Sequence, residues 1–271
     1  MATISVIIPS YNSEMTIIRA LESVMKQSLL PKEIIIVDDK STDNTLMTIN
    51  NFLLKKNTPI NIKIIKNDIN SGPAISRNIG VSESTSEWIA FLDSDDYWLP
   101  SKLESQIKIA EQHNSDIVSC AFYNGNPEYE NKKDGIPLMF SLIKSYNISF
   151  KKLLFKNFLS TPSVLMRKHI FLGFNEKIIF CEDYELWLRM TKSGARVRYI
   201  TNKYVVLGKK SYGVTGLSSN LLKMQLGESI AISKHFLDNP LIVFASLIFS
   251  WIKFIKRLII VLLRKFNLLD K

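Results

Sequence analysis

The chain has 271 residues, of which 46% are hydrophobic and 22% are charged. This length and composition allow one large α/β domain or two small ones and exclude disordered and fibrous proteins. The 35 Lys and Arg against 25 Asp and Glu give a formal net charge of +10, which suits nucleic acid, an anionic membrane or a phosphate-rich ligand alike.

The cysteine usage indicates a reducing compartment. Cys120 and Cys181 are the only two cysteines, and their spacing is not typical of a metal site or of a secreted disulfide scaffold. The N-terminal residues run directly into a strand pattern, without a basic segment and a long apolar stretch, so we expect no signal peptide. We therefore expect the chain to stay in the cytoplasm.

Strand and helix signals alternate through the first half of the chain. Short apolar runs between turn residues predict buried strands, and apolar residues at helical spacing predict the helices between them. The expected strands are residues 4–8, 33–37, 62–65, 88–92 and 117–122, and the expected helices are residues 17–24, 45–56, 71–81 and 99–113. This alternation predicts a largely parallel sheet with helices on both faces.

The second half carries a weaker pattern. We interpret residues 124–148 as an irregular insertion over the open edge of the sheet. The expected elements that complete the domain are a strand at 163–167, a helix at 182–192 and a strand at 197–206, followed by a helix at 217–236.

The strongest chemical signal is the acidic run at residues 93–96, directly after the strand expected at 88–92. In such sheets the ligand lies beyond the carboxyl ends of the strands. Asp93, Asp95 and Asp96 would repel each other in a closed site, and a divalent cation such as Mg²⁺ or Mn²⁺, which can bridge a diphosphate, relieves that repulsion. The alternative is a turn that caps the next helix, but a cap needs only one carboxylate.

Two further segments suit a nucleotide. Asp38 and Asp39 follow the second expected strand, where a carboxylate can accept hydrogen bonds from a base or a ribose, although a capping turn would have the same composition. The small residues at 70–76 allow a tight loop into a helix whose N-terminal amides favour anions. Arg77, one turn inside that helix, could bind a phosphate, and an incidental surface arginine fits this segment equally well.

A candidate general base opens the helix expected at 182–192. Glu182 and Asp183 are stabilised there by the helix dipole, which is a sufficient structural reason for them, yet a carboxylate in this place could also deprotonate a hydroxyl group. The three histidines, His113, His169 and His235, form no obvious ligand set.

Taken together, these segments resemble a known family. The motifs occur in order as IIPSYN at 7–12, VDDKSTD at 37–43, GPAISRNIG at 72–80, LDSDD at 92–96 and ED at 182–183. Over residues 3–220 the chain resembles the family 2 glycosyltransferases with the GT-A fold, including many bacterial polysaccharide enzymes. The resemblance implies an α/β catalytic domain at 1–220, with a donor-binding half at about 1–115 and an acceptor half at about 116–220.

The resemblance also implies roles for single residues in an inverting transfer of a hexosyl or N-acetylhexosaminyl group from a nucleotide-diphospho-sugar, with UDP as the default nucleotide. Asp183, beside Glu182, would be the general base toward a hydroxyl of a glycan or lipid-linked acceptor. The implied donor-binding residues are Pro9, Tyr11, Asp38, Asp39 and Asp93, and the implied ligands of Mn²⁺ or Mg²⁺ are Asp95 and Asp96. From their own segments, Arg77, Ser94 and Lys210 are further candidates for donor binding.

One departure from the family pattern concerns the metal. Many relatives supply a histidine near the end of the domain as a further ligand, and residues 207–218 contain none. The third ligand is therefore open, and Lys209 or Lys210 is a candidate to neutralise phosphate charge instead.

The C-terminal segment at 221–271 is expected to be a helical tail. Residues 241–266 are apolar but interrupted by five basic residues, so they do not resemble a spanning helix. Ser246, Ser250, Lys253, Arg257 and Arg264 fall on one helical stripe beside a broad apolar surface. We expect this helix to lie in the headgroup region on the inner face of the cell membrane, with packing in a homo-oligomer as the alternative.

Two other functions compete with a glycosyltransferase. A nucleotidyltransferase also uses paired carboxylates and a metal, but it usually needs a Gly-rich N-terminal phosphate loop, which residues 9–12 do not provide. A basic, non-catalytic module that binds RNA or membranes is the other rival. No recognised RNA motif and no dense basic patch occur in residues 1–200, so we expect no nucleic acid partner.

Overall fold

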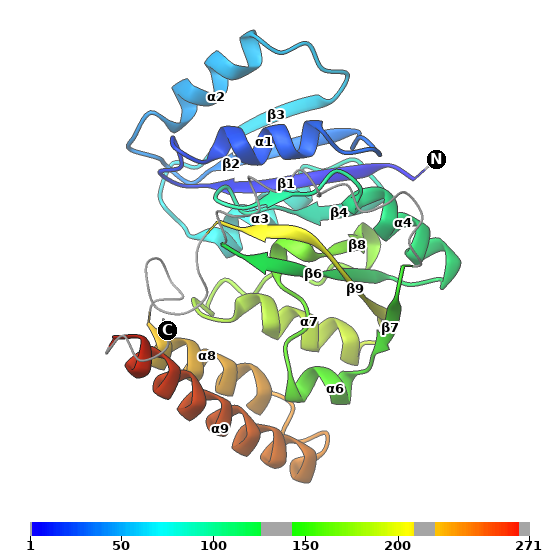
Figure 1. The fold of residues 1–271 in the computed structure, drawn as a ribbon, viewed down its shortest axis with the longest axis vertical. Coiled ribbons are helices and arrows are strands. Elements are labelled where there is room, and N and C mark those ends of the chain that lie inside the picture. Colours follow the sequence, from blue (N-terminus) through cyan, green and yellow to red (C-terminus); the bar gives the residue numbers. More distant parts are fainter. Residues whose placement is uncertain (1, 126–142, 209–219, 266–271) are drawn as a thin grey trace.

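The computed structural model describes residues 2–125, 143–208 and 220–265. They form a nine-stranded sheet in the order β3-β2-β1-β4-β8-β6-β9-β5, with β7 paired to β9. The strands are β1 Ile4–Ser10, β2 Glu33–Asp38, β3 Asn61–Lys66, β4 Trp88–Phe91, β5 Tyr97–Trp98, β6 Ile117–Asn124, β7 Ser145–Ile148, β8 Leu165–Arg167 and β9 Val197–Leu207. Figure 1 shows the sheet in the middle of the molecule with helices on both sides.

The N-terminal half of the sheet is parallel, as the alternating pattern predicts. β3, β2, β1 and β4 run in the same direction, with Ile7 of β1 opposite both Ile35 of β2 and Phe91 of β4. β1 and β2 are rich in β-branched residues, and β1, β2 and β4 are buried on both faces, as expected for a parallel sheet covered by helices, whereas the edge strand β3 is partly exposed. Beyond β4 the sheet is mixed, because β8 is antiparallel to both β4 and β6.

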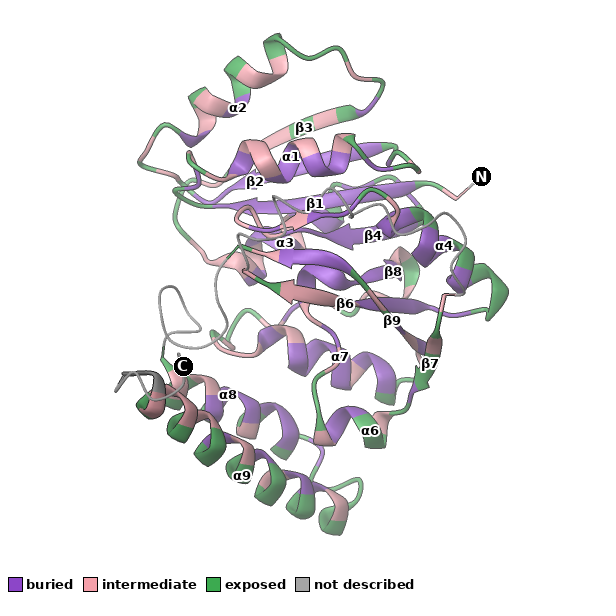
Figure 2. Ribbon diagram, in the orientation of Figure 1, coloured by how far each residue is buried: buried purple, intermediate pink, exposed green. Residues whose placement is uncertain are grey.

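The helices are α1 Ile17–Met25, α2 Thr45–Leu54, α3 Pro73–Ser82, α4 Lys102–Gln112, α6 Phe150–Phe155, α7 Glu182–Lys192, α8 Leu221–Ser233 and α9 Pro240–Lys265. Alternate residues of β1 enter two separate cores. Val6 and Ile8 pack with α1 and α4 on one face, and Ile7 packs with α3 and α7 on the other. Figure 2 shows buried residues on both sides of the central strands and an exposed outer surface on α2 and α9.

The structure differs from the sequence prediction mainly in short elements. The region expected to be irregular at 124–148 ends in β7, and α6 follows it directly. The strand expected at 163–167 is divided into a 3₁₀ turn, Thr161–Ser163, and the short strand β8. Trp98 lies in the unpredicted strand β5, and its indole N–H donates to the Pro162 carbonyl at 2.8 Å. These elements are short and depend on contacts between distant segments, so the local sequence does not predict them.

The C-terminal tail is helical, as predicted, and forms a hairpin of α8 and α9 at the end of the molecule away from β3 (Figure 1). The polar stripe on α9 faces the rest of the protein. Ser246 and Ser250 are buried, and Lys253 and Arg257 pair with Glu228 of α8. No helix in the part of the chain that the structure describes is long and apolar enough to cross a membrane.

Candidate active site

The predicted acidic segments meet at one edge of the sheet, because β1, β2 and β4 are parallel and end side by side. The Asn12 backbone N–H donates to the Ser41 hydroxyl at 3.0 Å, and this contact joins the loops after β1 and β2. The Ser13 and Ser94 hydroxyls are 2.7 Å apart and join the loops after β1 and β4. Ser94 thus lies in the predicted site, where it fixes the loop that carries the acidic run.

Asp38 has an unused acceptor in a buried position. Its Oδ2 accepts a hydrogen bond from the Ser41 backbone N–H at 3.1 Å. Its Oδ1 is buried and accepts no hydrogen bond from any described residue. A buried carboxylate oxygen without a donor is costly, so a ligand that brings an N–H or O–H to it would be favoured.

Asp39 has a different environment. Its carboxylate accepts hydrogen bonds from the Asn67 side-chain amide at 2.8 Å and from the backbone N–H groups of Ser71 and Gly72 at 2.9 and 2.7 Å. Gly72 has φ of 87°, a conformation that favours glycine and lets the loop enter α3. Asp39 therefore anchors this loop, and its two oxygens still have room for a further donor.

Pro9 and Tyr11 frame the same edge of the sheet. Pro9 is buried in β1 opposite Val37, so it shapes the floor beside Asp38. Tyr11 follows the strand and is 48% exposed, an unusual position for a large aromatic side chain. An accessible ring beside a hydrogen-bond acceptor is suitable for stacking on a base.

The end of β9 holds the acidic run in place. The Gly208 backbone N–H donates to Asp96 Oδ1 at 2.8 Å, and Arg19 donates to the Asp95 carbonyl oxygen at 2.7 Å. A methyl group on Gly208 would overlap that same carbonyl oxygen. Sequence reasoning did not single out Gly208 or Arg19, and the only available signal was a glycine directly after a strand.

The carboxylates of this loop differ in their contacts. Asp93 pairs with Arg77, and Asp96 accepts a hydrogen bond from the Gly208 backbone N–H. Within residues 2–125, 143–208 and 220–265, no three His, Cys, Asp or Glu side chains form a metal-binding group. Mg²⁺ commonly uses one or two carboxylates together with substrate phosphates, and Asp95 with Asp96 fits that arrangement. Lys209 and Lys210 lie outside the described residues.

Arg77 joins the two halves of the site. It donates to Asp93 Oδ1 at 2.7 Å and to Glu182 Oε1 at 3.0 Å, and it is almost fully buried. Burial opposes its charge, but Asp93 and Glu182 outweigh that effect and hold the pKa of Arg77 above its usual value. The guanidinium group is therefore held by two carboxylates, and phosphate binding by Arg77 stays a prediction from the sequence.

Asp183 lies in a partly buried position that raises its pKa. It accepts from the Thr161 hydroxyl at 3.1 Å and from the Tyr184 backbone N–H at 2.7 Å. Although part of the side chain reaches solvent, desolvation and the neighbouring Glu182 raise the pKa of Asp183 to about 7, against the opposing effect of Arg77. A base near neutrality can both accept and release a proton at physiological pH.

The loop before Asp183 is held by α8. Cys181 adopts a left-handed conformation with φ of 60°, and its thiol donates to the Met224 carbonyl of α8 at 3.4 Å. Gly227 of α8 lies so close to the Phe180 carbonyl that a methyl group there would overlap it. The loop that leads to Asp183 is therefore held in place by the C-terminal hairpin.

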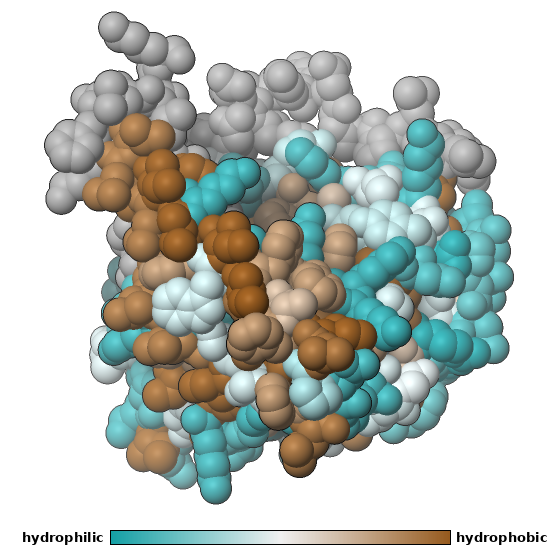
Figure 3. Space-filling view, turned by 90° about the horizontal axis from the view of Figure 1, so that it is seen from below, coloured by the Kyte–Doolittle hydropathy of each residue, from teal (hydrophilic) through white to brown (hydrophobic). Residues whose placement is uncertain are grey.

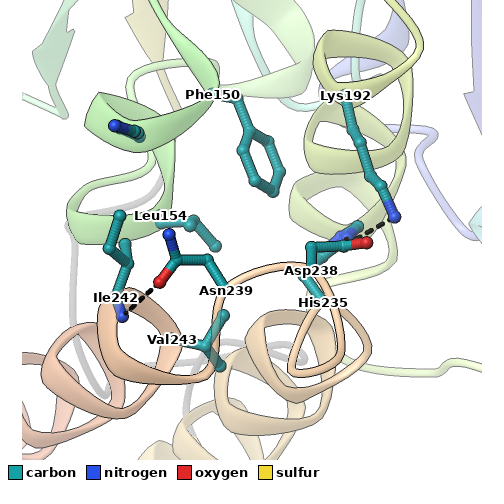
Figure 4. Close-up of a pocket in the computed structure, with 9 residues that line it drawn as sticks. Phe150, Leu154, Lys192, His235, Asp238, Asn239, Ile242 and Val243 are labelled. Atoms are coloured by element: carbon teal, nitrogen blue, oxygen red, sulfur yellow. Dashed lines mark hydrogen bonds and ion pairs between the residues drawn. The ribbon is translucent and has the colours of Figure 1, made fainter.

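A separate pocket of about 260 Å³ lies between α6, α7 and the link from α8 to α9. In Figure 4, Phe150 and Lys192 point toward this link, where Lys192 pairs with Asp238 at 2.6 Å. The pocket contains none of the residues predicted for the site, so it is not the place of the chemistry proposed below.

Comparisons with known proteins point to one family. The family model described as glycosyl transferase family 2 matches residues 5–173. The UDP-Glc:alpha-D-GlcNAc-diphosphoundecaprenol beta-1,3-glucosyltransferase WfgD of Escherichia coli is 31% identical over 242 residues, which are 88% of each chain. The poly(ribitol-phosphate) beta-N-acetylglucosaminyltransferase TarS of Staphylococcus aureus is 37% identical over 122 residues, which are 44% of this chain and 20% of that protein.

Solved structures show the same fold. Residues 1–349 of S. aureus TarS in complex with UDP-GlcNAc superpose with a TM-score of 0.63 at 24% identity, over 85% of this chain and 66% of that one. The mannosyltransferase PcManGT of Pyrobaculum calidifontis, in complex with GDP-Man and Mn²⁺, superposes with a TM-score of 0.68 at 18% identity, over 92% of this chain and 70% of that one.

Proposed function

Since the chain belongs to glycosyl transferase family 2, we propose that it transfers a hexosyl or N-acetylhexosaminyl group from a UDP-sugar to a hydroxyl of a lipid-linked or glycan acceptor, with inversion at the anomeric carbon. The family and the GT-A fold make the chain a glycosyltransferase and leave no support for a nucleotidyltransferase or a non-catalytic binding module. Relatives named for UDP-Glc and for diphosphoundecaprenol-linked or poly(ribitol-phosphate) substrates support a donor and an acceptor of this kind. The process would be the synthesis of a cell-surface polysaccharide.

The observation that carries the proposal is the bridge made by Arg77. One guanidinium group contacts Asp93 in the acidic loop and Glu182 beside the base, so the two chemical centres lie within one side chain of each other. We assign residues 1–115 to donor binding and residues 116–220 to acceptor binding, with Arg77 at their junction. This assignment explains why a donor-binding loop and a base that are far apart in the sequence are held together in the fold.

In the proposed reaction, Asp183 takes the proton of the acceptor hydroxyl while the oxygen attacks the anomeric carbon. The bond from that carbon to the diphosphate breaks on the opposite face, and UDP leaves with the electron pair. Asp38 would accept a hydrogen bond from the uridine, and Tyr11 would stack on its ring. Mn²⁺ or Mg²⁺, held by Asp95 and Asp96, would supply positive charge to stabilise the departing diphosphate.

We place the reaction at the inner face of the cell membrane, where residues 241–266 would meet an anionic surface. The net charge of +10 and the diphosphoundecaprenol acceptor in the name of a relative support this location.

The proposal is tested by measuring UDP release from a panel of nucleotide-sugars with Mn²⁺, with Mg²⁺ and with EDTA, in the presence of lipid-linked acceptors. Metal-dependent release from one UDP-sugar is the expected result, and Asp95→Asn should abolish it. If the protein binds no nucleotide in the presence of either metal, the assignment of the donor is wrong.

A further inference from the structure

The C-terminal hairpin presents an apolar face to the outside of the molecule. This apolar face comprises Leu226 and Ile230 of α8 and Phe244, Ile248, Ile252 and Ile255 of α9, each between 47% and 61% exposed. The four positions on α9 recur every three or four residues, so they form one continuous stripe. In Figure 3, hydrophobic side chains gather over a large part of the end of the molecule that the hairpin forms.

A group of polar residues of the hairpin, Gln225, Glu228, Ser250 and Lys253, points toward the protein. Ser250 donates to Glu228 at 2.8 Å and accepts from Gln225 at 2.8 Å, and all three side chains are buried. Lys253 donates to Glu228 at 2.9 Å and to the Phe155 carbonyl at 3.1 Å. A helix on a water-exposed surface normally turns its apolar side inward, so this arrangement is the reverse of the usual one.

The charges around the apolar face are complementary to an anionic surface. Exposed lysines lie on the hairpin, at Lys223 and Lys256, and on or directly after α6, which packs against α9, at Lys151, Lys152 and Lys156. Glu228 is the only acidic residue within α8 and α9, and it is consumed by the internal ion pairs. An apolar face bordered by lysines fits hydrocarbon next to anionic headgroups. A second copy related by a two-fold axis would place two like-charged borders against each other.

We propose that the apolar face of α8 and α9 inserts into the hydrocarbon of an anionic lipid bilayer, while the basic stripe of α9 faces the protein and locks the hairpin together. The proposal deepens the membrane location given under the proposed function. It also gives the hairpin a second role, since α8 holds the loop before Asp183 through the Cys181–Met224 contact. The base would therefore be fixed at a set height above the lipid, where a lipid-linked acceptor carries its sugar.

Trp251 provides a built-in probe for the hydrocarbon. It is 39% exposed on α9, whereas Trp88, Trp98 and Trp187 are buried. On addition of phosphatidylcholine–phosphatidylglycerol vesicles, we expect a blue shift of the Trp251 emission and its quenching by lipids brominated on the acyl chains. Binding without acyl-chain quenching would overturn insertion, because it would leave the helix outside the hydrocarbon.

A pair of matched double variants tests the surface. Ile248→Asp with Ile255→Asp changes the apolar face, and Met47→Asp with Leu54→Asp changes exposed apolar positions on α2. The first pair should lower the vesicle partition coefficient about a hundredfold, roughly tenfold for each lost apolar side chain, and the control should leave it unchanged. Equal flotation of both double variants with the vesicles would overturn the proposal.

Two further measurements separate the possible failures. Light scattering without lipid reports the oligomeric state. The apolar face would be assigned to a second copy instead if the wild-type protein forms a dimer, if the Ile248→Asp, Ile255→Asp variant does not, and if neither binds vesicles. UDP affinity without lipid should be the same in all variants, because none of the changed residues is among those assigned to donor binding. Vesicle binding by a protein without UDP affinity would refute the proposed donor and leave the membrane proposal intact.

Discussion

Removal of the Arg77 charge should damage both the stability of the protein and the ionisation of its base. Arg77→Met keeps much of the volume but leaves Asp93 and Glu182 without their shared partner at 2.7 and 3.0 Å. Breaking a buried ion pair costs roughly 3–5 kcal/mol. Because 28% of the Asp93 side chain is exposed and water can partly solvate it, we expect the lower end, about 3 kcal/mol. At about 2–4 °C per kcal/mol for a chain of this size, the melting temperature should fall by about 6–12 °C.

The same substitution should move the pH dependence of the reaction. Arg77 lowers the pKa of Asp183, so removing the Arg77 charge should raise that pKa above its present value of about 7. A neighbouring opposite charge shifts a carboxyl pKa by about one to three pH units, so the acidic limb of kcat/KM should move to higher pH by at least about one unit. Arg77→Lys retains a charge and should restore part of this shift, although an ammonium group does not provide the planar fork that spans both carboxylates.

Melting curves and pH–rate profiles of the three proteins test this reasoning. A matched control is Arg196→Met, which removes the more exposed partner of Asp116, paired at 2.7 Å, and should change stability less and leave the pH–rate profile unchanged. If Arg77→Met retains the wild-type profile and melting temperature, Arg77 neither supports the site nor influences Asp183.

Three further outcomes follow from the site. The wild-type kcat/KM should fall as the pH drops below about 7, because protonated Asp183 cannot accept the acceptor proton; a profile that stays flat down to pH 5 in a pH–rate series would contradict this role. Gly208→Ala should lower kcat about a hundredfold in the UDP-release assay, since the added methyl group displaces the Asp95 carbonyl, and wild-type turnover would refute this contact. Asp38→Asn should weaken UDP binding about tenfold by calorimetry, because a charged acceptor is lost, whereas unchanged affinity would show that the uridine lies elsewhere.

Much of the donor-binding half could be predicted from the sequence. The apolar runs and turn residues placed the first strands and helices to within a few residues, and parallel strands necessarily bring Asp38 and Asp93 to one edge. The ordered motifs supplied the family, which the family model and a 31% identical relative confirm. The roles of the single site residues remain predictions.

Contacts between distant segments could not be predicted in this way. The helical pattern around Arg77 does not reveal that Asp93 and Glu182 flank its guanidinium group, and so a phosphate was the natural expectation. Gly208 and Thr161 act on Asp95, Asp96 and Asp183 only through the tertiary fold.

The tail illustrates a different limit. Its spacing correctly placed Ser246, Ser250, Lys253 and Arg257 on one stripe, but a helical pattern does not say which side meets the protein. Glu228, on another helix, decides that question by pairing with the two basic residues. The apolar side is consequently the one that faces outward.

The most direct test of the account is transfer of a labelled sugar from UDP to a diphospholipid-linked acceptor by the wild-type protein and by Asp183→Asn. The amide keeps the shape of the side chain but cannot accept the hydroxyl proton, and loss of a general base costs about 10²–10⁴-fold in rate. We expect Asp183→Asn to bind UDP with wild-type affinity and to transfer sugar at least about a hundredfold more slowly. Transfer by Asp183→Asn at the wild-type rate would contradict the assignment of Asp183 as the base in the site that Arg77 joins.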